Sequence, residues 1–88
     1  MRITIYSKPD CHLCDEMKAI VHRVLDRDGH TSIEEIDISN DPVLLDRYGL
    51  EIPVLMIDGT KVAKYRVSEA ELRGMASGRG KGQGESKI

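Results

Sequence analysis

The only two cysteines of the chain, Cys11 and Cys14, lie three positions apart in the stretch SKPDCHLC. The residues before this stretch, RITIY, alternate as in a strand, and those after it follow a helical pattern. A thiol attacks a disulfide only as the thiolate, and an ordinary cysteine has a pKa of about 8.5. The N-terminus of a helix carries about half a positive charge and unpaired N–H groups, so it favours a thiolate. The spacing therefore predicts thiol–disulfide chemistry at this junction.

The two thiols are expected to have different roles. Cys11 comes first and is expected to be the more exposed, so it is the candidate nucleophile. Cys14 follows one helical turn later, where it can attack a mixed disulfide at Cys11 and release the substrate. Lys8 is a cation that favours the thiolate, whereas Asp10 is an anion that opposes it. His12 can donate a hydrogen bond, although a histidine here more often faces solvent. We expect Cys11 to be more acidic than a free cysteine.

The elements that must position these thiols follow from hydrophobic periodicity. Alternating β-branched residues predict strands, and spacings of three and four predict amphipathic helices. The expected strands are 2–6, 31–39, 53–57 and 60–66; the expected helices run from about Cys11 to the terminator Gly29, over 40–49, and from Ser68 through Leu72 towards Met75. A parallel βαβ unit needs a right-handed crossover helix. The sequence thus predicts an α/β fold in the order β-α-β-α-β-β-α, with one mixed four-stranded sheet flanked by helices.

Short local signals support several of these boundaries. Asp41 is the expected N-cap of the second helix, with Pro42 at its first position and Gly49 as its terminator. The dipeptide DG at 58–59 predicts a two-residue hairpin turn. The stretch SEAE at 68–71 has the pattern of a capping box and opens the last helix.

The composition is that of an ordinary globular domain. The chain has 88 residues, of which 40% are hydrophobic and 32% charged, and it lacks Phe and Trp, so Ile, Val, Leu and Met must fill the core. Its formal net charge of −2 gives no reason to expect nucleic acid or an anionic membrane as partner. No apolar run approaches the roughly 18 residues of a membrane span. Without a leader pattern or enough cysteines for a secreted scaffold, a cytoplasmic location is expected.

The domain is expected to end near residue 75. From Gly74 the sequence GMASGRGKGQGESKI holds five of the eight glycines and few side chains that can pack. Such a composition cannot bury enough apolar surface to offset the entropy of ordering. The sequence therefore predicts one domain over 1–75 and a Gly-rich, disordered tail over 76–88.

Two stretches far apart in the chain resemble one known family. SKPDCHLC, with its lysine three residues before the first cysteine, resembles the glutaredoxin site, and EIPVLMIDG resembles the segment that holds the cis-proline of that family. With the element order, they make residues 1–75 similar to the thioredoxin fold in its short, glutaredoxin-like form. A C-x-x-C alone is moderately specific, whereas C-x-x-C with a distant Ile-Pro at the third strand is much more so.

The resemblance implies roles for residues on both stretches. Cys11 would be the attacking thiol and Cys14 the resolving thiol. Pro53 would be cis and would face the dithiol across a groove. From sequence alone the bond before Pro53 is expected to be trans, because only about 5–6% of such bonds in folded proteins are cis. The backbone of Ile52 would pair with an extended peptide or glutathione, and Lys8 would meet a glutathione carboxylate.

Two departures from the family pattern lie in the same site. The usual Cys-Pro-Tyr-Cys is here Cys-His-Leu-Cys, so the aromatic residue between the thiols is missing. At the last strand-to-helix turn, a family Gly-Gly pair receives the γ-glutamyl end of glutathione, but this chain has YRVSEAEL. Tyr65 and Arg66 would fill or reshape that pocket, and the helix N-terminus at Ser68 would still receive a carboxylate.

We therefore expect a small enzyme that reduces protein disulfides or glutathione mixed disulfides. No bound cofactor is expected, and electrons would return from glutathione or from a thioredoxin-reductase-like flavoprotein. The alternative is a binding protein on the same fold that is redox-inert or holds a metal. A structural zinc site needs four ligands, and beyond the cysteines the best candidates are His12, His22 and His30.

Overall fold

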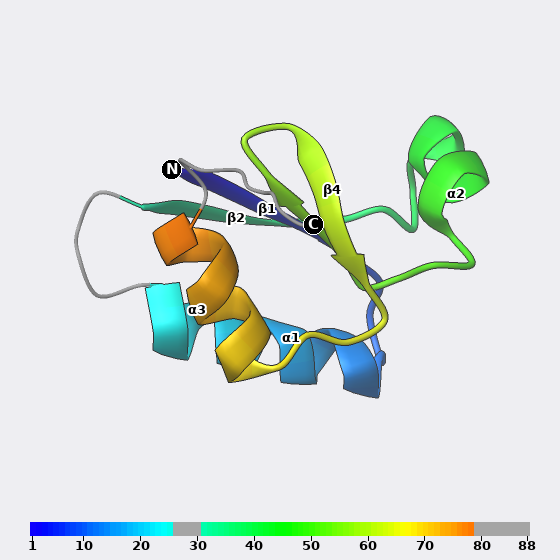
Figure 1. Ribbon diagram of the computed structural model, residues 1–88. Coiled ribbons are helices and arrows are strands. Elements are labelled where there is room, and N and C mark those ends of the chain that lie inside the picture. Colours follow the sequence, from blue (N-terminus) through cyan, green and yellow to red (C-terminus); the bar gives the residue numbers. More distant parts are fainter. Residues whose placement is uncertain (26–30, 79–88) are drawn as a thin grey trace.

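The computed structural model describes residues 1–25 and 31–78, and the element order predicted from the sequence is confirmed in these ranges (Figure 1). The strands are β1 (Arg2–Ser7), β2 (Ser32–Asp37), β3 (Val54–Ile57) and β4 (Thr60–Lys64), and the helices are α1 (His12–Leu25), α2 (Pro42–Tyr48) and α3 (Glu69–Gly78). The predicted terminator Gly29 and residues 79–88 of the predicted tail lie outside the described residues. None of the helices in these ranges is long and apolar enough to cross a membrane.

The four strands form one mixed sheet in the order β2-β1-β3-β4. β1 and β2 are parallel, with α1 as the crossover between them, whereas β3 runs antiparallel to both β1 and β4. The hairpin between β3 and β4 turns at Asp58 and Gly59, whose φ angles are +48° and +85°. Two successive positive φ angles are the mark of the turn that joins right-twisted strands, as the DG dipeptide predicted.

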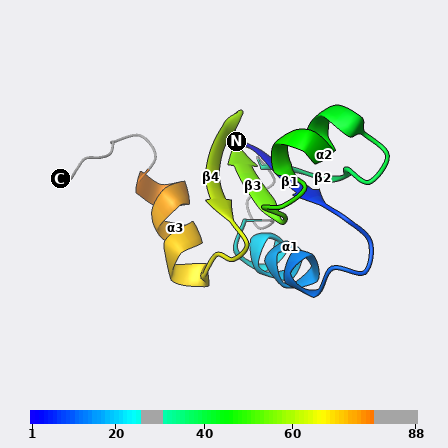
Figure 2. The ribbon, with the colours of Figure 1, turned by 90° about the vertical axis from the view of Figure 1, so that its right-hand side faces the viewer.

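One face of the sheet carries the hydrophobic core. α1 and α3 lie side by side on this face, and α2 lies on the other side of the sheet (Figures 1 and 2). Aliphatic side chains and one methionine fill the space between them: Ile3, Ile5, Met17, Val21, Leu25, Leu55, Ile57, Val67 and Leu72. On the opposite face, the ring of Tyr6 stacks on that of Tyr48 in α2, with 4.9 Å between the ring centroids.

Ion pairs tie α1 to its neighbours at the surface. Arg23 of α1 donates a hydrogen bond to Glu69 of α3, and this bond lowers the pKa of the Glu69 carboxyl. Lys18 and His22, also on α1, lie 3.7 and 2.7 Å from carboxylate oxygens of Glu35 on β2. These surface contacts link the helix that carries the cysteines to β2 and to α3.

Both ends of α2 lie where the sequence predicts them, at Asp41 and Gly49. The carboxylate of Asp41 accepts hydrogen bonds from the amides of Val43 and Leu44, both at 3.1 Å, which confirms the N-cap. Gly49 ends the helix but has a φ of −56°, so it does not adopt the left-handed conformation of many C-terminal glycines. A Cβ atom there would lie 2.5 Å from the carbonyl oxygen of Leu45, and this close approach explains the glycine.

The last helix is longer than expected. α3 runs to Gly78, so residues 76–78, predicted to begin a disordered tail, belong to the helix. Gly74 lies inside it, where nothing approaches within 4 Å of a Cβ position. One exposed glycine weakens a helix by only about 1 kcal/mol relative to alanine, which is too little to end it.

Candidate active site

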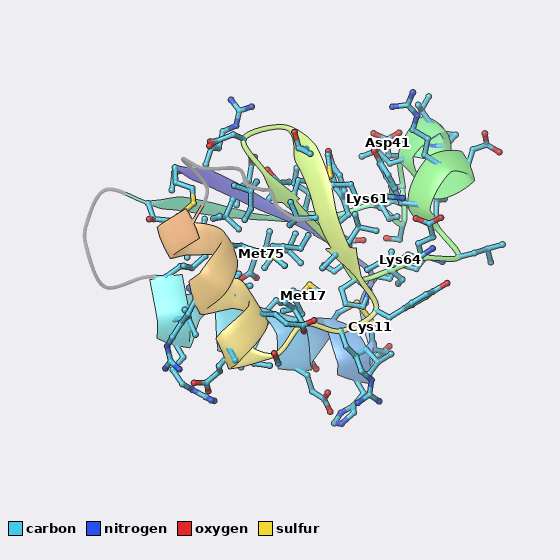
Figure 3. The ribbon with its side chains drawn as sticks, in the orientation of Figure 1. Cys11, Met17, Asp41, Lys61, Lys64 and Met75 are labelled. Atoms are coloured by element: carbon cyan, nitrogen blue, oxygen red, sulfur yellow. A yellow bond between two sulfur atoms is a disulfide. The ribbon has the colours of Figure 1, made fainter. Side chains whose placement is uncertain are left out.

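The two cysteines form a disulfide where β1 runs into α1 (Figure 3). Their Cα atoms are 5.1 Å apart. Cys11 directly precedes His12, the first residue of α1, and its carbonyl oxygen accepts the amide of Asp15 at 3.1 Å. Cys11 is therefore the N-cap residue of the helix, and the predicted strand-to-helix junction is confirmed.

The two sulfur-bearing residues differ in exposure. Cys14, in the first turn of α1, is fully buried, whereas Cys11 is partly exposed. The amide of Cys14 donates a hydrogen bond to Sγ of Cys11 at 3.1 Å. A backbone N–H that points at a sulfur at the helix N-terminus stabilises negative charge there, in the same direction as the helix dipole. The more exposed of the two cysteines is thus also the one whose sulfur the helix N-terminus favours as an anion.

Pro53 directly precedes β3, the strand that pairs with β1. The register of β1 and β3 places it level with Ser7, the last residue of β1. On its other side, the amide of Tyr65 donates to the Pro53 carbonyl at 2.8 Å. The Ile52–Pro53 peptide bond is cis, so the trans expectation from bond statistics alone is wrong. The trans preference before proline is only about 0.5–1 kcal/mol, so contacts on both sides can decide the isomer.

Two sets of contacts join the segment that precedes β3 to β4 and to Tyr65, the residue after β4. The hydroxyl of Tyr65 donates to the Leu50 carbonyl at 3.1 Å. Lys61 lies 2.8 Å from one carboxylate oxygen of Glu51, and Lys64 lies 4.0 Å from the other. The hydrogen bond between Lys61 and Glu51 lowers the pKa of the carboxyl and raises the pKa of the ammonium group. Sequence reasoning missed this set because its members are ten or more residues apart in the chain.

Two of the predicted binding residues are engaged within their own helices. His12 lies 2.9 Å from Glu16, one turn along α1, and its side chain is 85% exposed. The amide and hydroxyl of Ser68 form the predicted capping box with Glu71, at 2.9 and 3.0 Å. Lys8 is partly exposed and makes no ion pair with another described residue. Of the predicted binding residues that carry a positive charge, Lys8 and Arg66 make no ion pair with another described residue. Both are therefore available to bind a ligand.

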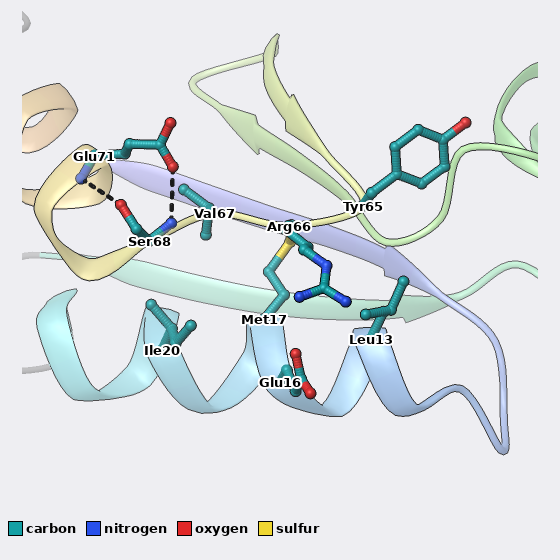
Figure 4. A pocket seen from close by; sticks show the side chains of 9 residues that line it. All are labelled: Leu13, Glu16, Met17, Ile20, Tyr65, Arg66, Val67, Ser68 and Glu71. Atoms are coloured by element: carbon teal, nitrogen blue, oxygen red, sulfur yellow. Dashed lines mark hydrogen bonds between the residues drawn. The ribbon is translucent and has the colours of Figure 1, made fainter.

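A groove of about 370 Å³ lies between α1 and the segment that joins β4 to α3 (Figure 4). Leu13, the residue between His12 and Cys14, lies at one end of it. The lining has an apolar floor and a polar rim: Leu13, Met17, Ile20 and Val67, with Glu16, Tyr65, Arg66, Ser68 and Glu71. Of these residues, the sequence points to Tyr65, Arg66 and Ser68, but not to those that α1 contributes. Within the described ranges, no three His, Cys, Asp or Glu side chains converge as a metal site would require.

Comparison with known proteins places this site in a family. The model of the family described as "Glutaredoxin-like domain (DUF836)" matches residues 2–75, which include both cysteines and Pro53. The chain belongs to the glutaredoxin-like family. It is also 34% identical over 77 residues to the glutaredoxin-like protein YDR286C homolog of Dictyostelium discoideum, a match that covers 82% of this chain and 71% of that protein.

Solved structures show the same fold. The X-ray structure of target protein XcR50 from X. campestris superimposes with a TM-score of 0.72 at 26% identity, over 85% of this chain and 95% of that chain. Reduced desulfothioredoxin from Desulfovibrio vulgaris Hildenborough gives a TM-score of 0.63 at 22% identity, over 86% and 78% of the two chains. This glutaredoxin-like chain therefore has the thioredoxin fold, and with its adjacent cysteine pair the fold supports a redox oxidoreductase in general.

Proposed function

We propose that this glutaredoxin-like protein is a dithiol–disulfide oxidoreductase that reduces protein disulfides or glutathione mixed disulfides. One observation carries the proposal: a disulfide at the N-terminus of α1, with Cys11 partly exposed and Cys14 buried behind it. A merely structural disulfide has no need of a helix N-terminus or of an accessible sulfur. A reactive one needs both, because the exchange proceeds through a thiolate that a substrate can reach.

The reaction runs in two exchanges. In the reduced protein the Cys11 thiolate attacks one sulfur of the substrate disulfide, and a bond to Cys11 forms as the substrate S–S bond breaks. The departing substrate thiolate takes up a proton. Cys14 then loses its proton and attacks Sγ of Cys11, which forms the disulfide of the present structure and releases the second substrate thiol. Two electrons pass from the dithiol to the substrate.

The oxidised protein must then be reduced again. We propose glutathione or a thioredoxin-reductase-like flavoprotein as the electron donor, and a reducing compartment such as the cytoplasm as the setting. For glutathione, Lys8 and Arg66 are the cations that would meet its carboxylates, and the backbone of Ile52 would pair with its peptide. Ser68 is less available to bind a carboxylate than the sequence implied, because its amide and hydroxyl are already hydrogen-bonded to Glu71.

Intact-mass measurement tests the proposal directly. Reduced protein mixed with a modest excess of oxidised glutathione should lose two hydrogens, through a transient glutathione adduct on Cys11. The Cys14→Ser variant should stop at the adduct, and the Cys11→Ser variant should form neither product. If neither the adduct nor the internal disulfide forms while both thiols still titrate, glutathione is not a substrate. Activity that survives Cys11→Ser would contradict the assignment of the nucleophile.

A further inference from the structure

Three consecutive side chains at the end of β4 are exposed, and two of them line the groove. Lys64, Tyr65 and Arg66 all face solvent, although successive side chains in a strand point to opposite faces. β4 ends at Lys64, and Tyr65 directly after it has a φ of +67°, a left-handed conformation that is uncommon for a bulky residue. The bonds from Tyr65 to the carbonyls of Pro53 and Leu50 hold this turn beside the segment that precedes β3.

Arg66 supplies the one charge in the groove lining that has no partner among the described residues. The two carboxylates of the lining are both engaged: Glu16 with His12, and Glu71 with the amide of Ser68. Figure 4 shows the Arg66 side chain extending from its segment towards α1, over the groove. The groove therefore presents a cation that is available to an incoming anion.

Two large side chains with apolar surface, Leu50 and Tyr65, are exposed in the segments that this turn joins. Leu50 is 94% exposed and Tyr65 is 43% exposed, and the Tyr65 hydroxyl holds the Leu50 backbone. Together with the apolar floor of the groove, they offer apolar surface to a molecule that also meets Arg66. The chain as a whole has a formal net charge of −2. The positive charge of Lys64 and Arg66 is therefore confined to this part of the surface.

We propose that the preferred substrates are proteins with an apolar residue and an acidic side chain next to the reactive cysteine, the acidic side chain being bound by Arg66. This substrate class rests on the proposed oxidoreductase function. The apolar side chain would pack in the groove beside Leu13 and against Tyr65. The carboxylate would accept charge-assisted hydrogen bonds from the guanidinium group, in the fork geometry that suits arginine. Opposite charges across a contact also raise the rate of encounter.

The test compares short peptides, each joined to a second copy by a disulfide, that differ only at one position near the cysteine. Every peptide carries leucine on one side of the cysteine and glutamate, glutamine or lysine on the other. The protein is reduced beforehand with dithiothreitol, which is then removed, so each dithiol reduces one peptide disulfide to two thiols. The glutamate peptide should react roughly tenfold faster than the lysine peptide at low salt, with glutamine between them. High salt should shrink this difference.

Substitutions distinguish a specific contact made by Arg66 from an effect of the net charge of the protein. Arg66→Glu should reverse the order of the peptides, and Arg66→Lys should keep the order with a smaller difference. Arg2→Glu makes the same change of charge on an exposed residue at the start of β1, the strand end away from the disulfide, so it should keep the wild-type order.

The outcomes are distinct. Equal rates for the three peptides, or the same reversal in Arg2→Glu, would overturn the proposed substrate class. Faster reaction with oxidised glutathione than with every peptide would mean that the groove serves glutathione, and would overturn it as well. If neither the peptides nor glutathione are reduced, the oxidoreductase function itself fails, and the inference about substrates fails with it.

Discussion

The amide nitrogen of Cys14 lies 3.1 Å from Sγ of Cys11 and donates its hydrogen to that sulfur. Cys14 thus contacts the sulfur of the proposed nucleophile through its backbone, whatever its side chain. The Cys14→Ser variant keeps this amide, so it should keep a reactive Cys11 thiolate while losing the thiol that resolves a mixed disulfide.

Replacement of either cysteine by serine should therefore have a different effect. Cys14→Ser should retain the release of glutathione from a glutathione mixed disulfide, with a second glutathione as the resolving thiol. It should also accumulate a covalent complex with a protein substrate. Cys11→Ser should fall to the rate of uncatalysed exchange in both assays. Mass spectrometry of the trapped complex would check the assignment, and a complex linked through residue 14 of the Cys11→Ser variant would contradict it.

Asp10 provides a test of the electrostatics around Cys11. It is exposed, directly precedes Cys11, and has a φ of +57°, a conformation that asparagine also tolerates. Asp10→Asn therefore removes a negative charge with little change in shape. Alkylation of Cys11 by iodoacetamide at pH 6 should become about two- to threefold faster at low salt, because a nearby anion no longer opposes the thiolate. Asp46→Asn, on the exposed side of α2, is the matched control and should leave the rate unchanged.

Several features that depend on neighbouring residues were predicted correctly from the sequence. Asp41 caps α2 because its carboxylate reaches amides two and three residues on, and the DG turn needs only two residues with positive φ. The junction that holds Cys11 and Cys14 belongs to the same class. It requires only that a strand ends and a helix begins around a C-x-x-C.

The contacts that shape the groove could not be predicted in this way. Tyr65 and Leu50 are fifteen positions apart, and their hydrogen bond exists only because the hairpin brings β4 beside the segment before β3. A left-handed turn is usually signalled by glycine, but here it is made by a tyrosine that tertiary contacts hold in place. The pairing of His12 with Glu16 is different: it spans one helical turn, and its i, i+4 spacing is a signal in the sequence that our sequence prediction did not use.

Two glycines give a matched pair of stability predictions. Gly59 has a φ of +85° in the β3–β4 turn, so Gly59→Ala should destabilise the protein by about 1–2 kcal/mol. Gly74 lies in α3 with open space around its Cβ position, so Gly74→Ala should stabilise it by about 0.5–1 kcal/mol. Urea denaturation of both variants checks the two signs. A loss of stability in Gly74→Ala would mean that α3 is not helical at that point.

The pair formed by Glu51 and Lys61 predicts a pH dependence. The hydrogen bond from Lys61 lowers the pKa of Glu51 below its ordinary value of 4.5. A carboxyl whose pKa is lower in the folded than in the unfolded state stabilises the fold above the unfolded value, and this contribution is lost as the pH falls through the folded value. The ammonium group of Lys61, whose ordinary pKa of 10.5 the same bond raises further, is charged throughout this acidic range. Glu51→Gln should therefore have a lower Tm than wild type at neutral pH.

The difference in Tm between wild type and Glu51→Gln should be modest, because the pair is exposed, and it should shrink in high salt. It should also disappear once the pH falls below the folded pKa of Glu51, because wild type is then protonated at the same position. Glu34→Gln, an exposed substitution on β2, is the control and should show no such convergence. Thermal unfolding of the three proteins from neutral pH into the acidic range makes the comparison. A constant difference between wild type and Glu51→Gln over that range would show that the carboxylate charge does not hold the segment before Pro53.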